Sequence, residues 1–461
     1  MNNNYEQLKK SATFNLSLSS KELFHTNLLS WLAMNDIKKF CKLINSMSNG
    51  KLQNKVWFHK LQEADEANVS FNDLNNKREM NSDNSGADAP VFVILREKMN
   101  FDFSIFIRGS ELGFDNDKKY YPVFVLENKV KSIPYPAQLD EYSEKIKNLY
   151  GKYWVKTSNK LDAYVYCIVL SLCENVPGLP FPDYPYEALG EEDKNRKKKS
   201  QNIFWYFCGY KKYSEYISDI YLHDDGVIGG SLNYLLIKDY ANNFIANLYN
   251  VSRDWLMPQD HYPLQPDADA KARRIDDIRQ KMIASNIAAD LEEYVKQEGF
   301  DVMIKAGFTH STGLVDIHVW INNDYLLKIQ IQGNDYRHVI EFMPNRGKDK
   351  KVKIDQAKID KNLRNKAWEL ETDGTLSKFF SFNNDLFPKD FFADNKLFPK
   401  NHSEGNYKQF GNSFLYTSKH VNTSLCEDEF IGTVKDDIKV AADLAKRLEG
   451  QFENYDIYSK V

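Results

Sequence analysis

The tripeptide Glu127-Asn128-Lys129 follows directly after an apolar, strand-like run, Pro122-Val123-Phe124-Val125-Leu126. Side chains of a strand alternate between its two faces, so Glu127 and Lys129 share one face. A pair of charges that faces solvent is usually preceded by alternating polar residues, whereas four apolar residues precede this pair. The pattern therefore predicts a carboxylate and a lysine side by side at the end of a mostly buried strand.

A third chemical group comes from the strand-like run Phe101–Ile107, in which Asp102 is the second residue. Paired residues of an antiparallel hairpin have a constant sum of residue numbers. Asp102 and Glu127 are therefore opposite each other if the polar loop Gly109–Lys119 is centred near residues 114 and 115, where Gly113-Phe114-Asp115 stands. We expect Asp102, Glu127 and Lys129 to converge at one sheet edge, unless a bulge shifts the register.

Two adjacent carboxylates repel each other unless a cation lies between them. Oxygen ligands of this kind suit Mg²⁺ or Mn²⁺, and the carbonyl of Asn128 is a candidate further ligand. Such a metal can lower the pKa of a bound water and neutralise charge on a phosphoryl oxygen. Lys129 would then orient the attacking water or stabilise the negative charge of the transition state.

The remaining elements have to position these groups. Apolar residues at helical spacing predict a helix from Ser20 to Asn45, opened by a capping box of Ser19 and Glu22. Pro134 and Pro136 open a second helix with Gln138, Tyr142 and Lys145 on one face. Further segments are expected as follows: a strand at Pro90–Leu95, strands within Ala163–Leu172 and Ile203–Gly209, a helix at Ser231–Asn250, and an insertion or mobile loop at Glu63–Asp88.

These residues in this order resemble the PD-(D/E)XK nuclease superfamily. Asp102, Glu127-Asn128-Lys129 and Gln138-Leu139-x-x-Tyr142 match its motifs, and Glu22-Leu23-Phe24-His25-Thr26 is similar to the opening motif of one bacterial branch. The resemblance covers residues 15–175 and extends at most to 257. Phe101 stands where the name of the superfamily has a proline.

The resemblance implies an α/β fold with a restriction-endonuclease-like core, in which a mixed sheet of order α-β-β-β-α-β is flanked by helices. It implies hydrolysis of phosphodiester bonds with Mg²⁺ or Mn²⁺ as cofactor. The implied metal ligands are Asp102, Glu127 and Asn128, and the implied catalytic residues are Asp102, Glu127, Lys129 and Gln138. Glu22, His25 and Tyr142 are implied supporting residues.

Each residue also has a purely structural interpretation. Glu22 fits the acid of a capping box, His25 a half-exposed helix residue, Asp102 a turn residue at a strand end, Glu127 with Lys129 an ion pair, and Gln138 with Tyr142 a helix-face pair. An exposed ion pair contributes only about 0–1 kcal/mol. The order of the residues after the expected strands favours the functional interpretation.

Composition limits the class of protein. The chain has 461 residues, a formal charge of −4, 42% hydrophobic and 27% charged residues, which excludes disorder as the main state. No apolar stretch reaches the ~20 residues of a membrane-spanning helix, and no signal peptide is visible. Five cysteines without a C-x-x-C pair predict reduced thiols and a cytoplasmic protein. Nucleic acid would have to bind a local patch, since the bulk charge is acidic.

Prolines at 258, 263 and 266 predict a boundary between a nuclease-like domain, 1–257, and a C-terminal α+β domain, 258–461. The second domain is expected to contain a helix (270–298), strands near 302–309, 315–321, 326–331 and 339–342, a charged helix (353–371) and a partly irregular remainder. Asp316 opens one strand as Asp102 does, and Gln330 and Gln332 stand where Glu127 and Lys129 would fall. This suggests a degenerate nuclease-like fold that binds a ligand without cutting; the alternative is an unrelated α+β domain.

The sequence therefore predicts a metal-dependent nuclease that acts on DNA, with RNA as a further substrate class and restriction or phage defence as its setting. A protein partner or a homodimer is compatible with this, and no membrane partner is expected. One alternative is a non-catalytic nucleic-acid-binding or sensor protein on the same fold. Another is a structural or interaction module in which the motif is a coincidence.

Overall fold

The chain falls into two compact units in the computed structural model. Unit 1 comprises Met1–Glu174 and Gly178–Ser252, and unit 2 comprises Asn175–Pro177 and Arg253–Val461. The structure describes residues 10–13, 23–71, 89–98, 100–114, 117–129, 132–133, 136–153, 165–173, 203, 205–223, 232–248, 276–322, 324–343, 408–410, 414–421 and 427–452, with isolated positions between 264 and 379 and at 458–459.

Unit 1 is built on a six-stranded mixed sheet of order β1-β2-β3-β4-β5-β6. Its strands are β1 Val69–Phe71, β2 Phe92–Lys98, β3 Phe101–Arg108, β4 Tyr120–Lys129, β5 Tyr166–Ser171 and β6 Trp205–Gly209. β2, β3 and β4 are antiparallel neighbours, whereas β1 runs parallel to β2, and β4, β5 and β6 are parallel to one another. β5 is buried along its whole length, as its continuous apolar run predicts.

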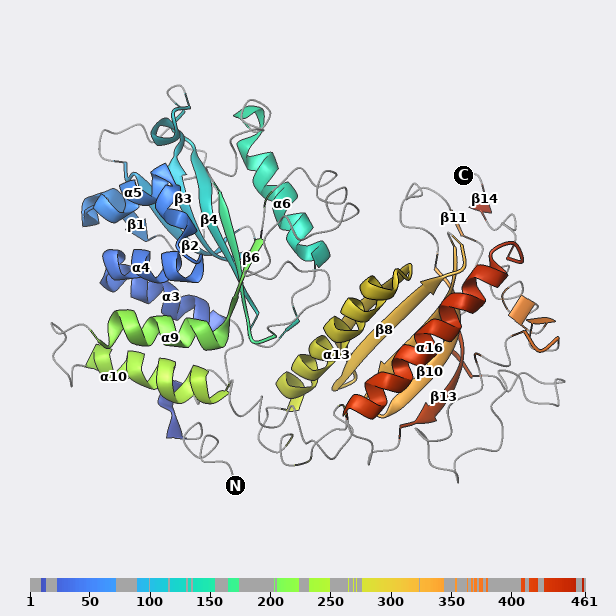
Figure 1. The fold of residues 1–461 in the computed structure, drawn as a ribbon. Helices are drawn as coiled ribbons and strands as arrows, with labels where there is room; N and C mark the ends of the chain where they lie inside the picture. Colours follow the sequence, from blue (N-terminus) through green and yellow to red (C-terminus); the bar gives the residue numbers. More distant parts are fainter. Residues whose placement is uncertain are drawn as a thin grey trace. The chain divides into compact units, whose positions relative to one another are not determined.

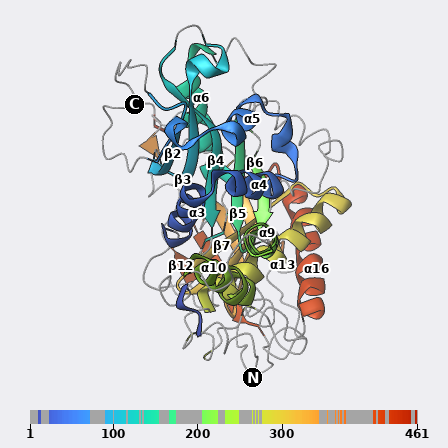
Figure 2. The same cartoon turned by 90° about the vertical axis from the view of Figure 1, so that its left-hand side faces the viewer.

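Helices cover both faces of this sheet (Figures 1 and 2). On one face lies α6, Pro136–Tyr150, which packs with Leu139, Tyr142 and Ile146 on odd-numbered residues of β4 and β5. On the other face lie α3, Leu23–Asn35, and α4, Ile37–Met47, where the rings of Phe40 and Phe103 are 5.5 Å apart. The remaining helices of unit 1 are α5 Val56–Glu63, α9 Tyr210–Tyr221, α10 Leu232–Lys238 and the π-helical turn Asp239–Ile245.

The expected single helix from Ser20 to Asn45 is two helices. Asp36 separates them: its φ of −157° is extended, and its carboxylate accepts a hydrogen bond from the main-chain N–H of Lys39 at 2.9 Å. A short acidic side chain competes with the helical hydrogen bonds and favours the N-cap. The expected loop between Glu63 and Asp88 is also partly wrong, because it contains β1; residues 72–88 and Glu22 lie outside the described residues.

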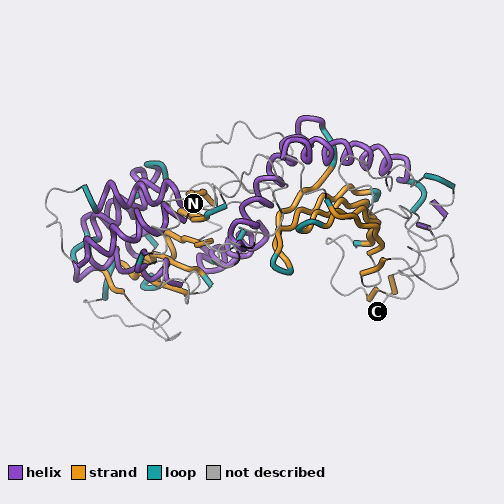
Figure 3. The backbone as a smooth tube through the Cα atoms, turned by 90° about the horizontal axis from the view of Figure 1, so that it is seen from below, coloured by secondary structure: helices purple, strands orange, loops and turns teal. Residues whose placement is uncertain are grey.

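Unit 2 is an antiparallel sheet of order β12-β13-β10-β9-β8-β7 with two long helices. The helices are α13 Asp276–Glu298 and α16 Glu427–Leu448, and they lie along one face of the sheet (Figure 3). The strands are β7 Val302–Thr309, β8 Thr312–Trp320, β9 Tyr325–Gln332, β10 Asp335–Phe342, β12 Lys408–Phe410 and β13 Phe414–His420; β11 Lys353–Ile354 and β14 Tyr458–Ser459 form a separate pair.

The sheet of unit 2 differs from that of unit 1, and the idea of a duplicated fold is therefore wrong. All neighbours in the second sheet are antiparallel, whereas the first contains three parallel pairs. Asp316 lies in the middle of β8 and does not open it. The expected charged helix at 353–371 is wrong at its start, which is β11, but Leu363, Lys366, Ala367, Glu369 and Leu370 are helical. The remainder contains β13 and the 22-residue α16, which were not expected.

Candidate functional site

β4 carries Glu127 and Lys129 to one edge of the first sheet, on the face covered by α6. Val125, two residues earlier on β4, belongs to the apolar cluster beneath α6, and strand alternation puts Glu127 and Lys129 on that same face. Every residue from Tyr121 to Lys129 is buried. The apolar run thus places two charged side chains at the C-terminal end of a buried strand.

Asp102 faces the same side. Phe103 pairs with Leu126 and Ser104 with Val125, so the residue numbers of each pair add to the predicted 229. This confirms the expected alignment on the Asp102 side of a bulge between Ile105 and Phe106. The charge of Asp102 acts on the phenol of Tyr142, which belongs to the α6 face. Asp102 Oδ2 accepts a hydrogen bond of 2.6 Å from the main-chain N–H of Asn128. Asp102 is thus fixed to the peptide that joins Glu127 to Lys129.

Glu127 and Lys129 form a nearly buried ion pair. Glu127 Oε1 lies 2.6 Å from Lys129 Nζ, and their side chains are 2% and 10% exposed. Each charge loses hydration at a cost of several kcal/mol when it is buried, and only a well-placed partner offsets that cost. The two residues thus form the ion pair of the structural interpretation, but the pair is buried, so the estimate of about 0–1 kcal/mol for an exposed pair does not apply to it.

The first turns of α6 bring two further polar groups to this pair. Gln138 Nε2 donates to Glu127 Oε1 at 3.1 Å and to the hydroxyl oxygen of Tyr142 at 2.6 Å. Burial raises the pKa of the Tyr142 phenol, the charges of Glu127 and Asp102 raise it further, and Lys129 and the bond from Gln138 act in the opposite direction. Tyr142 therefore experiences the field of all three charged residues, which places it in the same cluster.

Asn128 points to the opposite face of the sheet. Its side-chain Oδ1 accepts a hydrogen bond from the hydroxyl of Tyr210, the first residue of α9, and both residues are buried. The side-chain amide of Asn128 therefore does not face Glu127 and Lys129. Only the main-chain carbonyl of Asn128 can therefore serve as the expected metal ligand.

His25 also lies behind the sheet. It is buried rather than half-exposed: its Nδ1 lies 2.8 Å from the hydroxyl of Tyr240, and its ring meets that of Tyr210 edge-on at 5.7 Å between centroids. Tyr240 belongs to the π-helical turn, a feature often found near functional sites. The structure thus connects His25 through Tyr210 to Asn128 and not to the carboxylate face. Nothing is described for Glu22.

Tyr210 and Tyr240 are the two residues that sequence reasoning missed at this site. Tyr210 directly follows the buried strand β6, at the same sheet edge at which β4 ends, because Lys129 pairs with Ser171 and Ser171 with Gly209. Groups at the carboxyl ends of adjacent parallel strands gather at one edge, and that rule could have found Tyr210. No sequence signal pointed to Tyr240.

A second charged cluster crosses the sheet of unit 2. Lys328 Nζ lies 3.4 Å from Asp316 Oδ2 and 3.3 Å from Glu341 Oε2, and Gln330 Nε2 donates to Asp316 Oδ1 at 2.9 Å. Burial raises the pKa of Glu341. Glu341 was not anticipated, because β10 was expected to begin only at Val339. Here Lys328 lies between the carboxylates of Asp316 and Glu341 and forms an ion pair with each of them.

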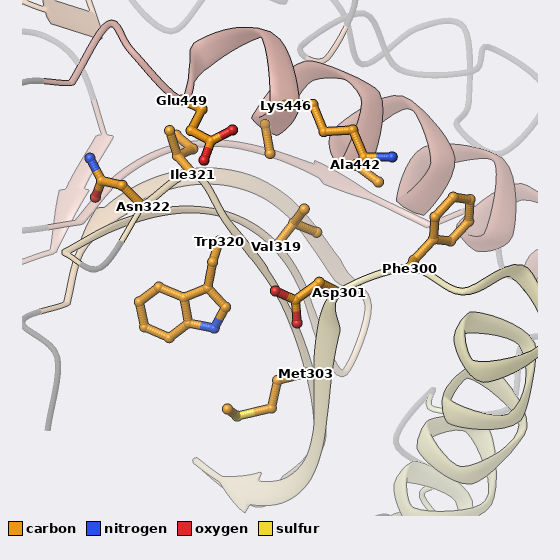
Figure 4. Close-up of a pocket in the computed structure, with 11 residues that line it drawn as sticks. Phe300, Asp301, Met303, Val319, Trp320, Ile321, Asn322, Ala442, Lys446 and Glu449 are labelled. Atoms are coloured by element: carbon orange, nitrogen blue, oxygen red, sulfur yellow. The ribbon is translucent and has the colours of Figure 1, made fainter. Parts of the chain in front are cut away.

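A cavity of about 540 Å³ also belongs to unit 2 (Figure 4). Trp320, Met303 and Phe300 supply its apolar walls, and Lys446 of α16 and Glu449, which directly follows that helix, contribute charge. Asn322 also lines the cavity. Its Oδ1 stabilises the local turn, because it accepts hydrogen bonds from the main-chain N–H groups of Asp324 and Tyr325. None of the lining residues belongs to either charged cluster.

Three further observations concern metal-ligating side chains, helix length and the cysteines. Within the described ranges, no three His, Cys, Asp or Glu side chains are grouped so as to hold a metal ion. Among the helices that the structure describes, none has the length and apolarity needed to cross a bilayer. Cys41, Cys167, Cys173 and Cys208 are buried and form no disulfide among the described residues.

Comparisons of the chain with protein-family models, with curated proteins and with solved structures found no match.

Proposed function

We propose that this protein is a metal-dependent nuclease of the PD-(D/E)XK kind, which hydrolyses phosphodiester bonds and has DNA as its expected substrate. The observation that carries the proposal is the contact of Glu127 with both Lys129 and Gln138, while Asp102 binds the peptide between the first two. The order of α3 and α4, then β2 to β4, then α6 and β5 supports the resemblance to a restriction-endonuclease-like core.

The residues at this edge fit Mg²⁺ better than Zn²⁺. Mg²⁺ is usually held by one or two carboxylates together with waters and substrate phosphates, whereas zinc sites need three or four protein ligands. Asp102 and Glu127 supply the two carboxylates, and the main-chain carbonyl of Asn128 is a third oxygen. A carboxylate has about four lone-pair sites, so the bonds described above leave capacity for a cation.

When bound there, Mg²⁺ or Mn²⁺ would lower the pKa of a bound water and neutralise charge on a phosphoryl oxygen. The protein's own residues have separate roles. Lys129, already beside Glu127, supplies positive charge to the phosphoryl group as negative charge develops. Gln138 holds the orientation of Glu127, and Tyr142 holds Gln138.

One observation favours a second function. The ion pair of Glu127 and Lys129 is satisfied internally, at 2.6 Å and almost without solvent. A protein that keeps this pair closed would bind nucleic acid, or sense it, without cutting. In that case unit 1 would serve recognition, and cleavage would not occur with any metal.

Cleavage assays on the full chain distinguish the two functions. Labelled duplex DNA, single-stranded DNA and RNA are incubated with Mg²⁺, with Mn²⁺ or with a chelator. The nuclease proposal expects metal-dependent cleavage that Asp102→Asn and Glu127→Gln abolish. Glu144→Gln is the matched control, because Glu144 also pairs with a lysine but is 64% exposed on α6. Binding of a nucleic acid without cleavage would favour the sensor function.

The expected setting in restriction or phage defence is tested separately. Cells that carry the wild-type chain or the Glu127→Gln variant are challenged with phage, and plaque numbers are counted. Protection that depends on Glu127 supports defence by cleavage, whereas equal protection by both forms contradicts it.

A further inference from the structure

Lys145 extends the row of polar groups that α6 presents. It lies seven residues after Gln138 and three after Tyr142, so all three share one helix face. Its Nζ is 5.0 Å from the centroid of the Tyr142 ring. Helical side chains lean towards the N-terminus of their helix, and this directs Lys145 towards the end of α6 where Gln138 contacts Glu127.

The ammonium group of Lys145 has no carboxylate partner among the described residues. Glu141 stands four residues before it, at the spacing that favours an ion pair, yet Lys145 lies over the ring of Tyr142 instead. Lys147, two residues further along the same helix, does have a partner, since its Nζ lies 2.5 Å from Glu144 Oε1. The two lysines thus carry the same charge in the same helix but differ in whether that charge is compensated.

We propose that Lys145 binds a backbone phosphate of the nucleic-acid substrate close to the bond that is cut. This inference rests on the proposed nuclease function and adds the substrate contact that sets position along the strand. A lysine binds phosphate as a point charge, and an aromatic face keeps the ammonium group in place without neutralising it.

The helix geometry limits which phosphate this is. Seven residues of α-helix span about 10 Å along the axis, and one strand of B-DNA rises about 3.4 Å per nucleotide. The phosphate at Lys145 therefore lies within about three nucleotides of the scissile bond, if the strand follows α6. A substrate truncated to fewer nucleotides on that side loses the contact.

The test uses the salt dependence of binding by the full chain. Fluorescence anisotropy with a labelled duplex is measured between 50 and 200 mM salt, roughly the range over which such contacts are resolved. Ca²⁺ replaces Mg²⁺, so that the duplex is not cleaved. The variants are Lys145→Gln, Lys145→Arg and Lys147→Gln, of which the last changes the net charge equally and serves as the control.

Loss of one phosphate contact lowers the magnitude of the log–log slope by about 0.9 and the affinity by roughly five- to tenfold. We expect both changes for Lys145→Gln, neither for Lys147→Gln, and retention of the slope in Lys145→Arg. In Mg²⁺, Lys145→Gln should raise KM while kcat stays close to that of the wild type. Equal slopes for Lys145→Gln and the wild type, or equal losses in the two glutamine variants, would overturn the proposal.

Failure of the proposed function has a different signature. In that case the wild-type chain itself neither cleaves with Mg²⁺ nor shows a salt-dependent affinity, and the role of Lys145 falls with it. If the wild type binds and cleaves while Lys145→Gln binds with an unchanged slope, only the inference on Lys145 is wrong.

Discussion

The replacement Glu127→Gln tests the energetics of the buried ion pair. It keeps the shape of the side chain but removes the charge that lies 2.6 Å from Lys129 Nζ, and the side chain of Lys129 is 10% exposed. Removal of one partner from a buried pair typically costs about 3–5 kcal/mol, because the remaining charge is poorly solvated. A globular domain is stable by about 5–15 kcal/mol, so this is a large fraction of the total.

The assay is differential scanning calorimetry of the full chain without added metal. In a domain of the size of unit 1, each kcal/mol shifts Tm by about 2–4 °C. The Tm of unit 1 should therefore be lower by roughly 6–20 °C in Glu127→Gln than in the wild type. The double variant Glu127→Gln with Lys129→Met removes both charges and should recover most of the loss, since a neutral pair of similar shape carries no uncompensated charge.

The matched control is Glu144→Gln on α6. Glu144 and Lys147 are 2.5 Å apart, about the same distance as the pair in β4, but Glu144 is 64% exposed. The side chain of Lys147 is 15% exposed, so the two pairs differ mainly in the exposure of the carboxylate. Pairs that are open to solvent contribute about 0–1 kcal/mol, so Tm should move by no more than about 4 °C. Equal and small shifts for Glu127→Gln and Glu144→Gln would refute the reasoning, because they would mean that burial does not strengthen the dependence of Lys129 on its partner.

Three further predictions concern Lys129, Tyr210 and Lys419. Lys129→Met should retain Mn²⁺ binding, measured by electron paramagnetic resonance, but lose cleavage, whereas Asp102→Asn should lose both; loss of Mn²⁺ binding in Lys129→Met would contradict its placement outside the ligand set. Tyr210→Phe should lower the free energy of unfolding by about 1–3 kcal/mol in urea, because it removes the hydroxyl that donates to the buried Oδ1 of Asn128; a change below experimental error would show that this bond is dispensable. Burial lowers the pKa of Lys419 from 10.5 to about 8. The unfolded chain therefore binds more protons than the folded one between these values, and the stability of unit 2 should rise with pH from about 8 to 10.5. Lys419→Met should raise Tm most below pH 8 and progressively less above it; a gain that does not change with pH would contradict the assignment.

Much of unit 1 follows from local patterns. The hairpin was predictable because β3 and β4 are adjacent in the chain. The observed pairs Phe103–Leu126 and Ser104–Val125 have the expected register, which a bulge between Ile105 and Phe106 sets one residue apart from the register beside the loop. The same alternation predicted that Glu127 and Lys129 share a face. Gln138 and Tyr142 were predictable as neighbours because they are one turn apart on one helix.

The predictions from sequence were wrong where one local pattern is compatible with two different structures. An apolar stripe from Leu23 to Ile44 is continuous enough for one helix, but the carboxylate of Asp36 begins a second one. In unit 2, the order of a helix, strands and a helix resembled that of unit 1. Strand direction depends on how connections cross the sheet, however, and the spacing of apolar residues does not record it.

The sequence by itself determined which side chains carry charge, which of them share a strand or helix face, and that the hairpin pairs the start of β3 with the end of β4. Only the tertiary structure decided that the Glu127–Lys129 pair is buried, that Asn128 turns away to Tyr210, and that His25 meets Tyr240 behind the sheet. Tyr210 lies 82 residues from Asn128, and Tyr240 lies 215 residues from His25. Periodicity orients a side chain relative to its own element, but the partner that it meets is set by the packing of distant segments around a common core.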